Sequence, residues 1–123
     1  MKFKAVEKAN PNNREVKKWY AQIVFNGEAT MDELVRDIEK FSALSEPDIR
    51  GVVIALENVV QTKLAEGKIV RFDKLGSLYP SLSSNGVGKR EMVSANNIRS
   101  VKVNYRAGKR IIDALKNAVK TKV

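Results

Sequence analysis

The chain has 123 residues, with 23 Lys plus Arg, 14 Asp plus Glu and a formal net charge of +9. It contains no Cys and no His, which excludes a disulfide framework, a thiol nucleophile, an imidazole base and any metal site held by thiolate or imidazole. The length fits one domain whose modest core would gain from dimerisation. No apolar run approaches the roughly 18 residues of a membrane span, and no apolar segment typical of a secretory signal is present. We therefore expect a cytoplasmic protein that does not enter a membrane.

The positive charge is unevenly distributed along the chain. Residues 1–20 hold six basic and two acidic side chains, residues 21–66 hold four and nine, and residues 67–123 hold thirteen and three, so the three segments carry +4, −5 and +10. A segment this basic produces a one-sided potential that attracts phosphate backbones. The pattern predicts a nucleic-acid partner. The alternatives are a merely soluble cationic surface, or association with the ribosome or a membrane surface.

The N-terminal part predicts two strands separated by a turn. Residues 3–6 and 16–25 are rich in β-branched and aromatic types, and the Asn and Pro residues at 10–13 indicate the turn between them. Trp19 and Tyr20 are adjacent in the second strand and must point to opposite faces. We expect Trp19 to pack in a core, and stacking of these aromatic rings on nucleic-acid bases is the alternative.

Two helices are predicted next. Thr30 with Glu33 three residues later forms a capping-box pattern, followed by an apolar stripe of about three turns. Ser45 is the predicted N-cap of a longer helix, with Pro47 in its first turn and Gly67 at its end. The apolar stripe of this second helix is too long for a small monomer to bury. A partner helix from a second copy is therefore expected.

The last third of the chain predicts strands, a hairpin tip and a helix. The strands are expected, in chain order, at residues 69–70, 75–82 and 92–105. The segment 81–90 is small, polar and glycine-containing, and it ends in Lys89 and Arg90, so it predicts an unanchored tip followed by two cations. A final helix is expected from Lys109 to Lys120, with its cations on the outer surface.

Four short segments carry a resemblance to a known family. The first is Leu44-Ser45, which opens the long helix. The other three are Leu64-Ala65-Glu66-Gly67-Lys68-Ile69-Val70, Leu75-Gly76-Ser77-Leu78 and Asn104-Tyr105-Arg106-Ala107-Gly108-Lys109. They are similar to the helix-to-strand turn, the G-F-G-T-F segment and the F-K-P-G-K segment of the HU/IHF family of bacterial histone-like DNA-binding proteins. The resemblance extends over residues 30–123. Residues 1–29 look like the N-terminal β extension of a longer HU-type branch seen in Bacteroidetes.

The resemblance implies an α+β fold that forms an HU/IHF-like intertwined dimer. Each chain would contribute two N-terminal helices, a three-stranded β region with a protruding hairpin arm and a C-terminal helix. The implied organisation is an N-terminal β extension over residues 1–29 and an HU-like DNA-binding domain over residues 30–123. The two arms of such a dimer reach around a duplex into its minor groove.

The resemblance also implies which residues bind DNA. Gly76 and Ser77 match a turn whose backbone amides lie against phosphate, and Arg106 and Lys109 match cations that meet the sugar-phosphate backbone. Cations beside the tip would enter or flank the minor groove, whose negative potential favours them; ordinary solubility of the hairpin is the alternative. The candidate DNA-binding residues are Lys74, Gly76, Ser77, Ser83, Ser84, Lys89, Arg90, Arg99, Lys102, Arg106, Lys109 and Arg110.

The chain departs from the family pattern within the arm. The arm, bounded by Leu78 and Ala95, is shorter than usual, and its tip lacks the R-N-P-x-T-G signature with the proline that wedges between base pairs. Ala107 stands where the family has proline. These departures call sharp kinking of DNA into question, while the glycines and cations remain.

The sequence therefore predicts a non-catalytic, architectural DNA-binding protein of the bacterial nucleoid. Its acidic residues form no pair suited to acid-base chemistry, and no catalytic residue, metal or cofactor is expected. We expect a homodimer that binds duplex DNA with low sequence specificity and compacts or bends it. Two alternatives remain: a protein-interaction module whose N-terminal strands add to a partner's sheet, and an RNA-binding protein that uses the basic face.

Overall fold

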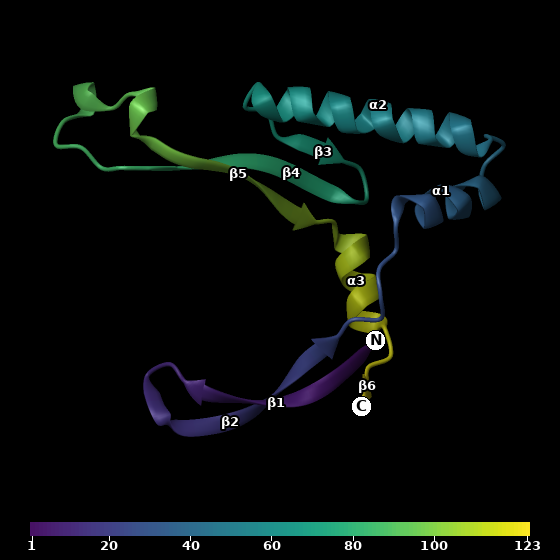
Figure 1. Ribbon diagram of the computed structural model, residues 1–123, viewed down its shortest axis with the longest axis horizontal. Coiled ribbons are helices and arrows are strands. Elements are labelled where there is room, and N and C mark those ends of the chain that lie inside the picture. Colours follow the sequence, from purple (N-terminus) through teal and green to yellow (C-terminus); the bar gives the residue numbers. More distant parts are fainter.

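The computed structural model describes residues 1–123 as an α+β chain with three helices and two three-stranded sheets (Figure 1). The first sheet has the strand order β2-β1-β6, with β1 antiparallel to β2 and parallel to β6. The second sheet is antiparallel, with the order β3-β4-β5. The strands are β1 (Lys2–Asn10), β2 (Asn13–Val24), β3 (Val70–Phe72), β4 (Gly76–Ser84), β5 (Ile98–Ala107) and β6 (Thr121–Lys122). The helices are α1 (Met31–Lys40), α2 (Glu46–Ala65) and α3 (Lys109–Asn117).

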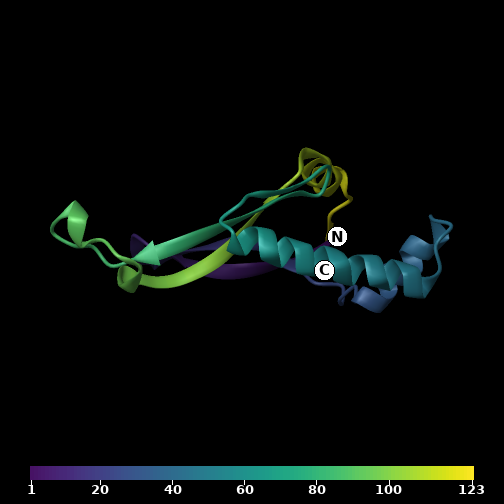
Figure 2. The ribbon, with the colours of Figure 1, turned by 90° about the horizontal axis from the view of Figure 1, so that it is seen from above.

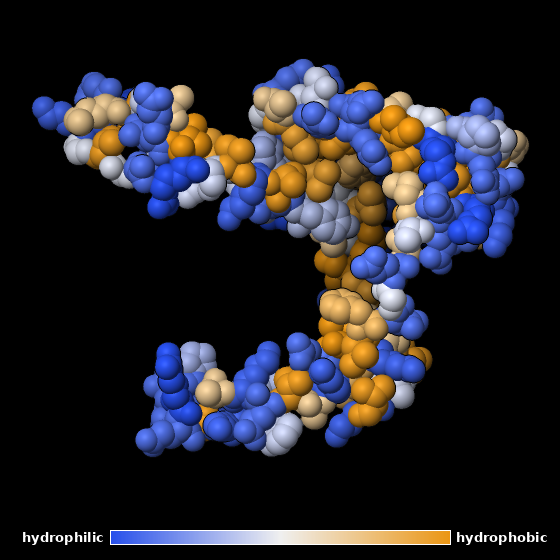
Figure 3. All heavy atoms as spheres, viewed as in Figure 1, coloured by the Kyte–Doolittle hydropathy of each residue, from blue (hydrophilic) through white to orange (hydrophobic).

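The two sheets form separate projections. Strands β4 and β5 extend beyond the short β3 as a two-stranded arm, and the β1–β2 hairpin forms the second projection, with α3 between them (Figure 1). Both projections point in the same direction when the molecule is turned by 90° (Figure 2). The space-filling view shows an open gap between them (Figure 3). The chain is therefore fork-shaped. We call its two projections, the β4–β5 arm and the β1–β2 hairpin, the two prongs.

The predicted helix starts are confirmed by their caps. The Thr30 hydroxyl accepts a hydrogen bond from the Glu33 amide at 3.4 Å. The Ser45 hydroxyl accepts one from the Asp48 amide at 3.4 Å and donates to the Asp48 carboxylate at 2.9 Å. Such caps satisfy amides that have no partner within the helix. Beyond the end of α2, Gly67 adopts a φ of 82°, which favours glycine.

The single chain has almost no core. Val35 and Ile49 are its only buried hydrophobic side chains, and they lie on α1 and α2, which pack together. Large apolar side chains are instead exposed on all three helices and on β2, β4 and β5, as shown by Val101 on β5 at 72% and Val59 on α2 at 53%. Apolar surface on this scale is typical of a face that another chain covers. No helix of the chain is long and apolar enough to cross a lipid bilayer.

The arm tip differs from its prediction. Ser81 to Ser84 lie within β4, and Met92 and Val93 lie outside β5, which begins only at Ile98. The segment between the strands contains two 3₁₀ turns, Arg90–Met92 and Ala95–Asn97. The second turn is held by a capping box in which the Ser94 amide donates to the Asn97 side chain at 2.7 Å. The prediction of strand at Met92 and Val93 was wrong because these local side-chain hydrogen bonds compete with strand pairing.

The C-terminal end also differs. The helix predicted to reach Lys120 ends at Asn117, and residues 121–122 form β6 on the edge of β1. The Thr121 amide donates to the Met1 carbonyl at 3.0 Å, and the Val123 amide donates to the Phe3 carbonyl at 2.9 Å. The Met1 ammonium donates in turn to the Val119 carbonyl at 3.0 Å. Pairing with a strand more than one hundred residues away thus overrides the local helical pattern.

The N-terminal strands are longer than predicted, and their aromatic residues are more exposed. The strands expected at residues 3–6 and 16–25 extend over Lys2–Asn10 and Asn13–Val24. Trp19 was expected in a core, but 68% of its surface is exposed. The expectation fails within the single chain because no second layer packs against this sheet.

We predict that Gly76→Ala destabilises the fold. Gly76 is buried with a φ of +120°, and a Cβ there would overlap the Arg106 carbonyl oxygen and lie 2.8 Å from the Gly108 amide nitrogen. The expected loss in the free energy of unfolding is roughly 2 kcal/mol or more, because strained backbone and overpacking add. Urea denaturation at a fixed protein concentration measures it. Gly88→Ala is the control, since Gly88 faces open space at an ordinary φ; equal losses in both variants would contradict the prediction.

Candidate nucleic-acid interface

The register of β4 and β5 gives the arm two faces of opposite character. Directly paired residues of antiparallel strands share a face, and successive residues alternate between faces. The pairs on the first face, which we call the polar face, are Ser77–Arg106, Tyr79–Asn104, Ser81–Lys102 and Ser83–Ser100. The pairs on the second face, which we call the apolar face, are Leu78–Tyr105, Pro80–Val103 and Leu82–Val101. One strand pair therefore presents hydroxyl groups and cations on one side and an apolar surface on the other.

A row of three residues crosses the base of the polar face. Arg71 of β3 pairs with Ser77, and Ser77 pairs with Arg106, so one hydroxyl lies between two guanidinium-bearing residues. Arg71 Nη1 donates to Ser77 Oγ at 3.4 Å. These residues, with Ile69 and Tyr79, line a shallow hollow of about 180 Å³. Guanidinium groups bind phosphate oxygens by paired hydrogen bonds, so this row can hold a phosphate group.

Hydrogen bonds between side chains order the polar face along the arm. Asn104 Nδ2 donates to Ser81 Oγ at 2.8 Å, and Arg99 Nη2 donates to Ser83 Oγ at 3.1 Å. The Ser84 hydroxyl, beyond an irregularity in the register, instead donates to the Asn85 carbonyl at 2.9 Å. The serines of β4 thus position side chains of β5. The structure leaves the Lys102 ammonium without a carboxylate partner on this face.

The cations of the C-terminal part face little neutralising charge within the chain. Of the candidate DNA-binding residues only Lys109 forms an ion pair, at 2.8 Å to Asp113. The cations of this part that have no carboxylate partner within 4.0 Å include Arg71, Lys74, Lys89, Arg90, Arg99, Lys102, Arg106 and Arg110. Unneutralised cations on an exposed surface release counterions from a bound phosphate backbone, which favours binding.

The start of α3 lies beside the turn between β3 and β4. Gly108 is the N-cap of α3, and its amide donates to the Leu75 carbonyl at 3.3 Å. No side chain caps this helix, and its first turn contains Lys109 and Arg110 but no acidic residue. Cations at the positive end of a helix dipole are unfavourable, whereas an anion there is stabilised. The backbone of Lys74 lies against Gly108, and Lys109 and Arg110 stand in the first turn, so three cationic residues lie in the chain next to this helix start.

Lys89 and Arg90 are separated from these residues by the length of the arm. They lie in the segment that connects β4 to β5, at the outer end of the arm (Figure 1). The Asn85 amide closes the base of this segment by donating to the Asn97 carbonyl at 2.8 Å. The candidate cations therefore form two groups, one at the base of the sheet and one at the tip.

The structure refines the set of candidate residues. It brings Ser77, Lys102 and Arg106 together on the polar face with Ser83, whereas Gly76 is buried beneath the β5 end of the sheet. Sequence reasoning missed Arg71. The signal was present in Val70-Arg71-Phe72, where a single cation alternates with two apolar residues on a strand.

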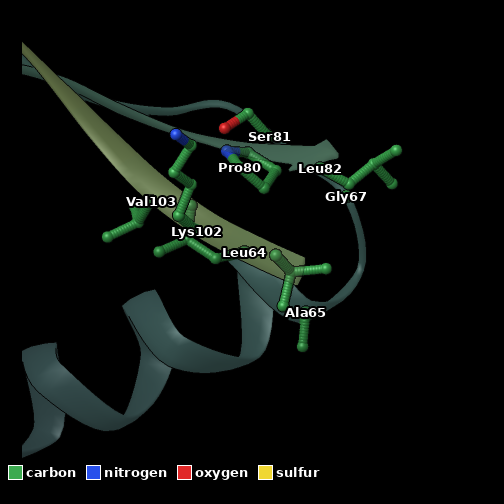
Figure 4. Close-up of a pocket in the computed structure, with 9 residues that line it drawn as sticks. Leu64, Ala65, Gly67, Pro80, Ser81, Leu82, Lys102 and Val103 are labelled. Carbon is green, nitrogen blue, oxygen red and sulfur yellow. The ribbon is translucent and has the colours of Figure 1, made fainter. Parts of the chain in front are cut away.

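The apolar face of the arm forms a hollow with the C-terminal end of α2. The hollow has a volume of about 590 Å³ (Figure 4). Its apolar lining comes from Leu64, Ala65, Pro80, Leu82, Val101 and Val103, and Gly67, Ser81 and Lys102 complete the lining. A lining of this kind suits apolar side chains of another chain rather than phosphate.

Comparisons with known proteins identify the family of the chain and a similar fold. A family model described as HU-HIG, "HU domain fused to wHTH, Ig, or Glycine-rich motif", matches residues 1–122. Among solved structures, a Bacteroides vulgatus protein described as a "Putative bacterial DNA binding protein" is similar, with a TM-score of 0.63 and 18% identity over 99% of this chain. The chain spans about half the length of that protein, 48%. No curated protein matches the chain.

Proposed function

The chain belongs to the HU-HIG family, and on that premise we propose that it is a non-catalytic, architectural DNA-binding protein that holds duplex DNA with low sequence specificity and compacts or bends it. The observation that carries the proposal is the polar face, where Arg71, Lys102 and Arg106 share one side of the β3–β4–β5 sheet. The structural neighbour described as a DNA-binding protein adds support. A nucleoid location in a bacterial cell follows from this proposal.

The residue types favour contact with phosphates over contact with bases. Arginine, lysine, hydroxyl groups and helix N-termini bind the sugar-phosphate backbone and fix the position of the protein without reporting sequence. Two side chains of the arm that could bind base edges, Asn104 and Arg99, already donate to Ser81 and Ser83. Affinity should therefore depend strongly on salt and weakly on base sequence.

The arm tip is the proposed minor-groove element. Lys89 and Arg90 supply the positive charge that a narrow minor groove attracts. Met92 and Val93 beside them are 59% and 63% exposed. Apolar side chains of this kind contact base steps in architectural proteins that bend DNA. They are the most exposed large apolar residues of a tip that lacks the family's proline.

We further propose that the functional unit is an intertwined homodimer. The support is the hollow of about 590 Å³ on the apolar face, together with the exposed apolar stripe of α2. A second copy would supply the side chains that the single chain lacks for a core. In this proposal residues 30–123 form the HU-like DNA-binding domain and residues 1–29 form the β extension. Strand β6, from the C-terminal part of the chain, is the third strand of the sheet that the extension forms.

The proposed homodimer can be tested by measuring the mass of the protein in solution. The wild-type protein should have twice the 13.8 kDa mass of one chain in sedimentation equilibrium. Val101→Asp should break the dimer or unfold it, because it places a carboxylate on the apolar face. Ser100→Asp is the control, since Ser100 lies next to it on the polar face. A stably folded wild-type monomer would contradict the dimer.

The polar face makes a prediction about salt dependence. We expect Arg71→Gln/Lys102→Gln/Arg106→Gln to weaken binding to a random-sequence duplex at low salt. Fluorescence anisotropy at several salt concentrations gives the slope of log K, the association constant, against log salt concentration, which we call the salt slope. Its magnitude should fall by roughly 2 to 3, at about 0.9 per lost phosphate contact.

The control for the polar face removes the same charge elsewhere. Arg36→Gln/Lys40→Gln/Lys63→Gln changes three cations on α1 and α2 and should leave the slope unchanged. Equal slopes in wild type and the polar-face variant would exclude this surface as the binding site. Tighter binding to a matched RNA duplex than to the DNA duplex would overturn the choice of DNA.

The arm tip can be tested by removing its two cations. Lys89→Ala/Arg90→Ala should make the salt slope shallower by up to about 2, because two phosphate contacts are lost at the end of the arm. Lys116→Ala/Lys120→Ala is the matched control, since the Lys120 ammonium is occupied by the Lys116 and Ala118 carbonyls. If both double variants bind like wild type, the tip does not contact DNA.

A further inference from the structure

The register of the N-terminal hairpin separates its charges by face. Over the regularly paired part of β1 and β2, one face carries the pairs Lys2–Val24, Lys4–Gln22, Val6–Tyr20 and Lys8–Lys18. The opposite face carries Phe3–Ile23, Ala5–Ala21, Glu7–Trp19 and Ala9–Lys17. The first, which we call the lysine face, holds four cations and no carboxylate. The only acidic residue of the paired part, Glu7, lies on the opposite face.

The lysine face has no neutralising partner within the chain. On the opposite face Glu7 and Lys17 form an ion pair at 3.9 Å, so the charges there cancel. None of the four lysines of the lysine face lies within 4.0 Å of a carboxylate. The whole net positive charge of the paired part of β1 and β2 therefore lies on the lysine face.

The placement of these lysines is unfavourable for the hairpin itself. Lys8 and Lys18 are directly opposite each other, and like charges at directly opposed positions destabilise a strand pair. The sheet that contains them has three strands, one of which is only two residues long, and no second layer. A two-stranded hairpin of this kind is marginally stable in water. A bound polyanion would attract both lysines and offset their mutual repulsion.

The dimensions and side chains of the lysine face suit a duplex backbone. Lys2 and Lys8 are six residues apart, which is about 20 Å along a strand. That length corresponds to roughly six phosphates of one DNA strand at 3.4 Å each along the axis. Tyr20, 46% exposed, and Gln22 lie among the lysines and can donate hydrogen bonds to sugar and phosphate oxygens.

We propose that the lysine face of the N-terminal hairpin is a second duplex-binding surface, which contacts the phosphate backbone of the DNA held by the polar face. This inference rests on the proposed function. The two prongs that carry these surfaces project in the same direction from α3 (Figures 1 and 2), and an open gap separates them (Figure 3). The acidic segment of the chain, residues 21–66, contains α1 and α2. None of the cations of the lysine face or of the polar face belongs to this segment.

The test removes the lysine face from the full chain. Lys4→Gln/Lys8→Gln/Lys18→Gln should reduce the salt slope for a random-sequence DNA duplex by roughly 2 to 3, in addition to weakening binding at low salt. The hairpin should stay folded, because the substitutions relieve the repulsion between Lys8 and Lys18. Far-ultraviolet circular dichroism checks this. The same positions changed to arginine should keep the wild-type slope.

The controls separate this inference from the proposed function. The α1–α2 variant Arg36→Gln/Lys40→Gln/Lys63→Gln loses the same charge and should bind like wild type. If the polar-face variant lowers the slope and the lysine-face variant does not, the second surface is excluded while the proposed function stands. If the wild-type chain fails to bind duplex DNA at low salt, the proposed function and this inference fall together. A lysine-face variant that matches the α1–α2 control, or an arginine variant that loses the slope, also overturns the second surface.

Discussion

The alternation of side chains along paired strands is the constraint on which this molecule depends. Because a strand pair has two faces and a fixed register, each residue of the arm is assigned to a surface by its position alone. The result is a sheet that is cationic and hydroxyl-rich on one side and apolar on the other. The same rule acts on the N-terminal hairpin, where it separates four lysines from the ion pair of Glu7 with Lys17. A one-residue slip in either register would turn the side chains of one strand to the opposite face and mix the two surfaces.

The two faces impose different requirements on the protein. The apolar face can be satisfied only by more apolar surface, and the single chain supplies too little: its buried hydrophobic side chains are Val35 and Ile49. The polar face favours an anion, since the basic part of the chain holds only three acidic residues to neutralise its cations. In the proposed function, self-association and polyanion binding both follow from this one strand pairing. The contact of Gly76 with the Arg106–Gly108 backbone keeps the base of the sheet and the start of α3 together, so that both requirements are met at fixed positions.

Local signals in the sequence predicted local structure well. The caps at Thr30 and Ser45 and the stop at Gly67 depend on residues a few positions apart, and each is where it was expected. The family resemblance was also correct, since the HU-HIG family model matches residues 1–122. Features set by distant partners were missed. Arg71 joins the polar face only through pairing of β3 with β4, and β6 exists only because β1 offers it an edge.

The pairing of β6 with β1 has a consequence for how the molecule opens. Chain ends are usually the first segments to fray, each independently of the other. Here Met1 and Phe3 accept hydrogen bonds from Thr121 and Val123, and the Met1 ammonium donates to Val119. Residues 1–3 and 119–123 therefore support each other, and loosening of either segment breaks hydrogen bonds made by the other. The two segments act as one structural unit at the base of the N-terminal hairpin.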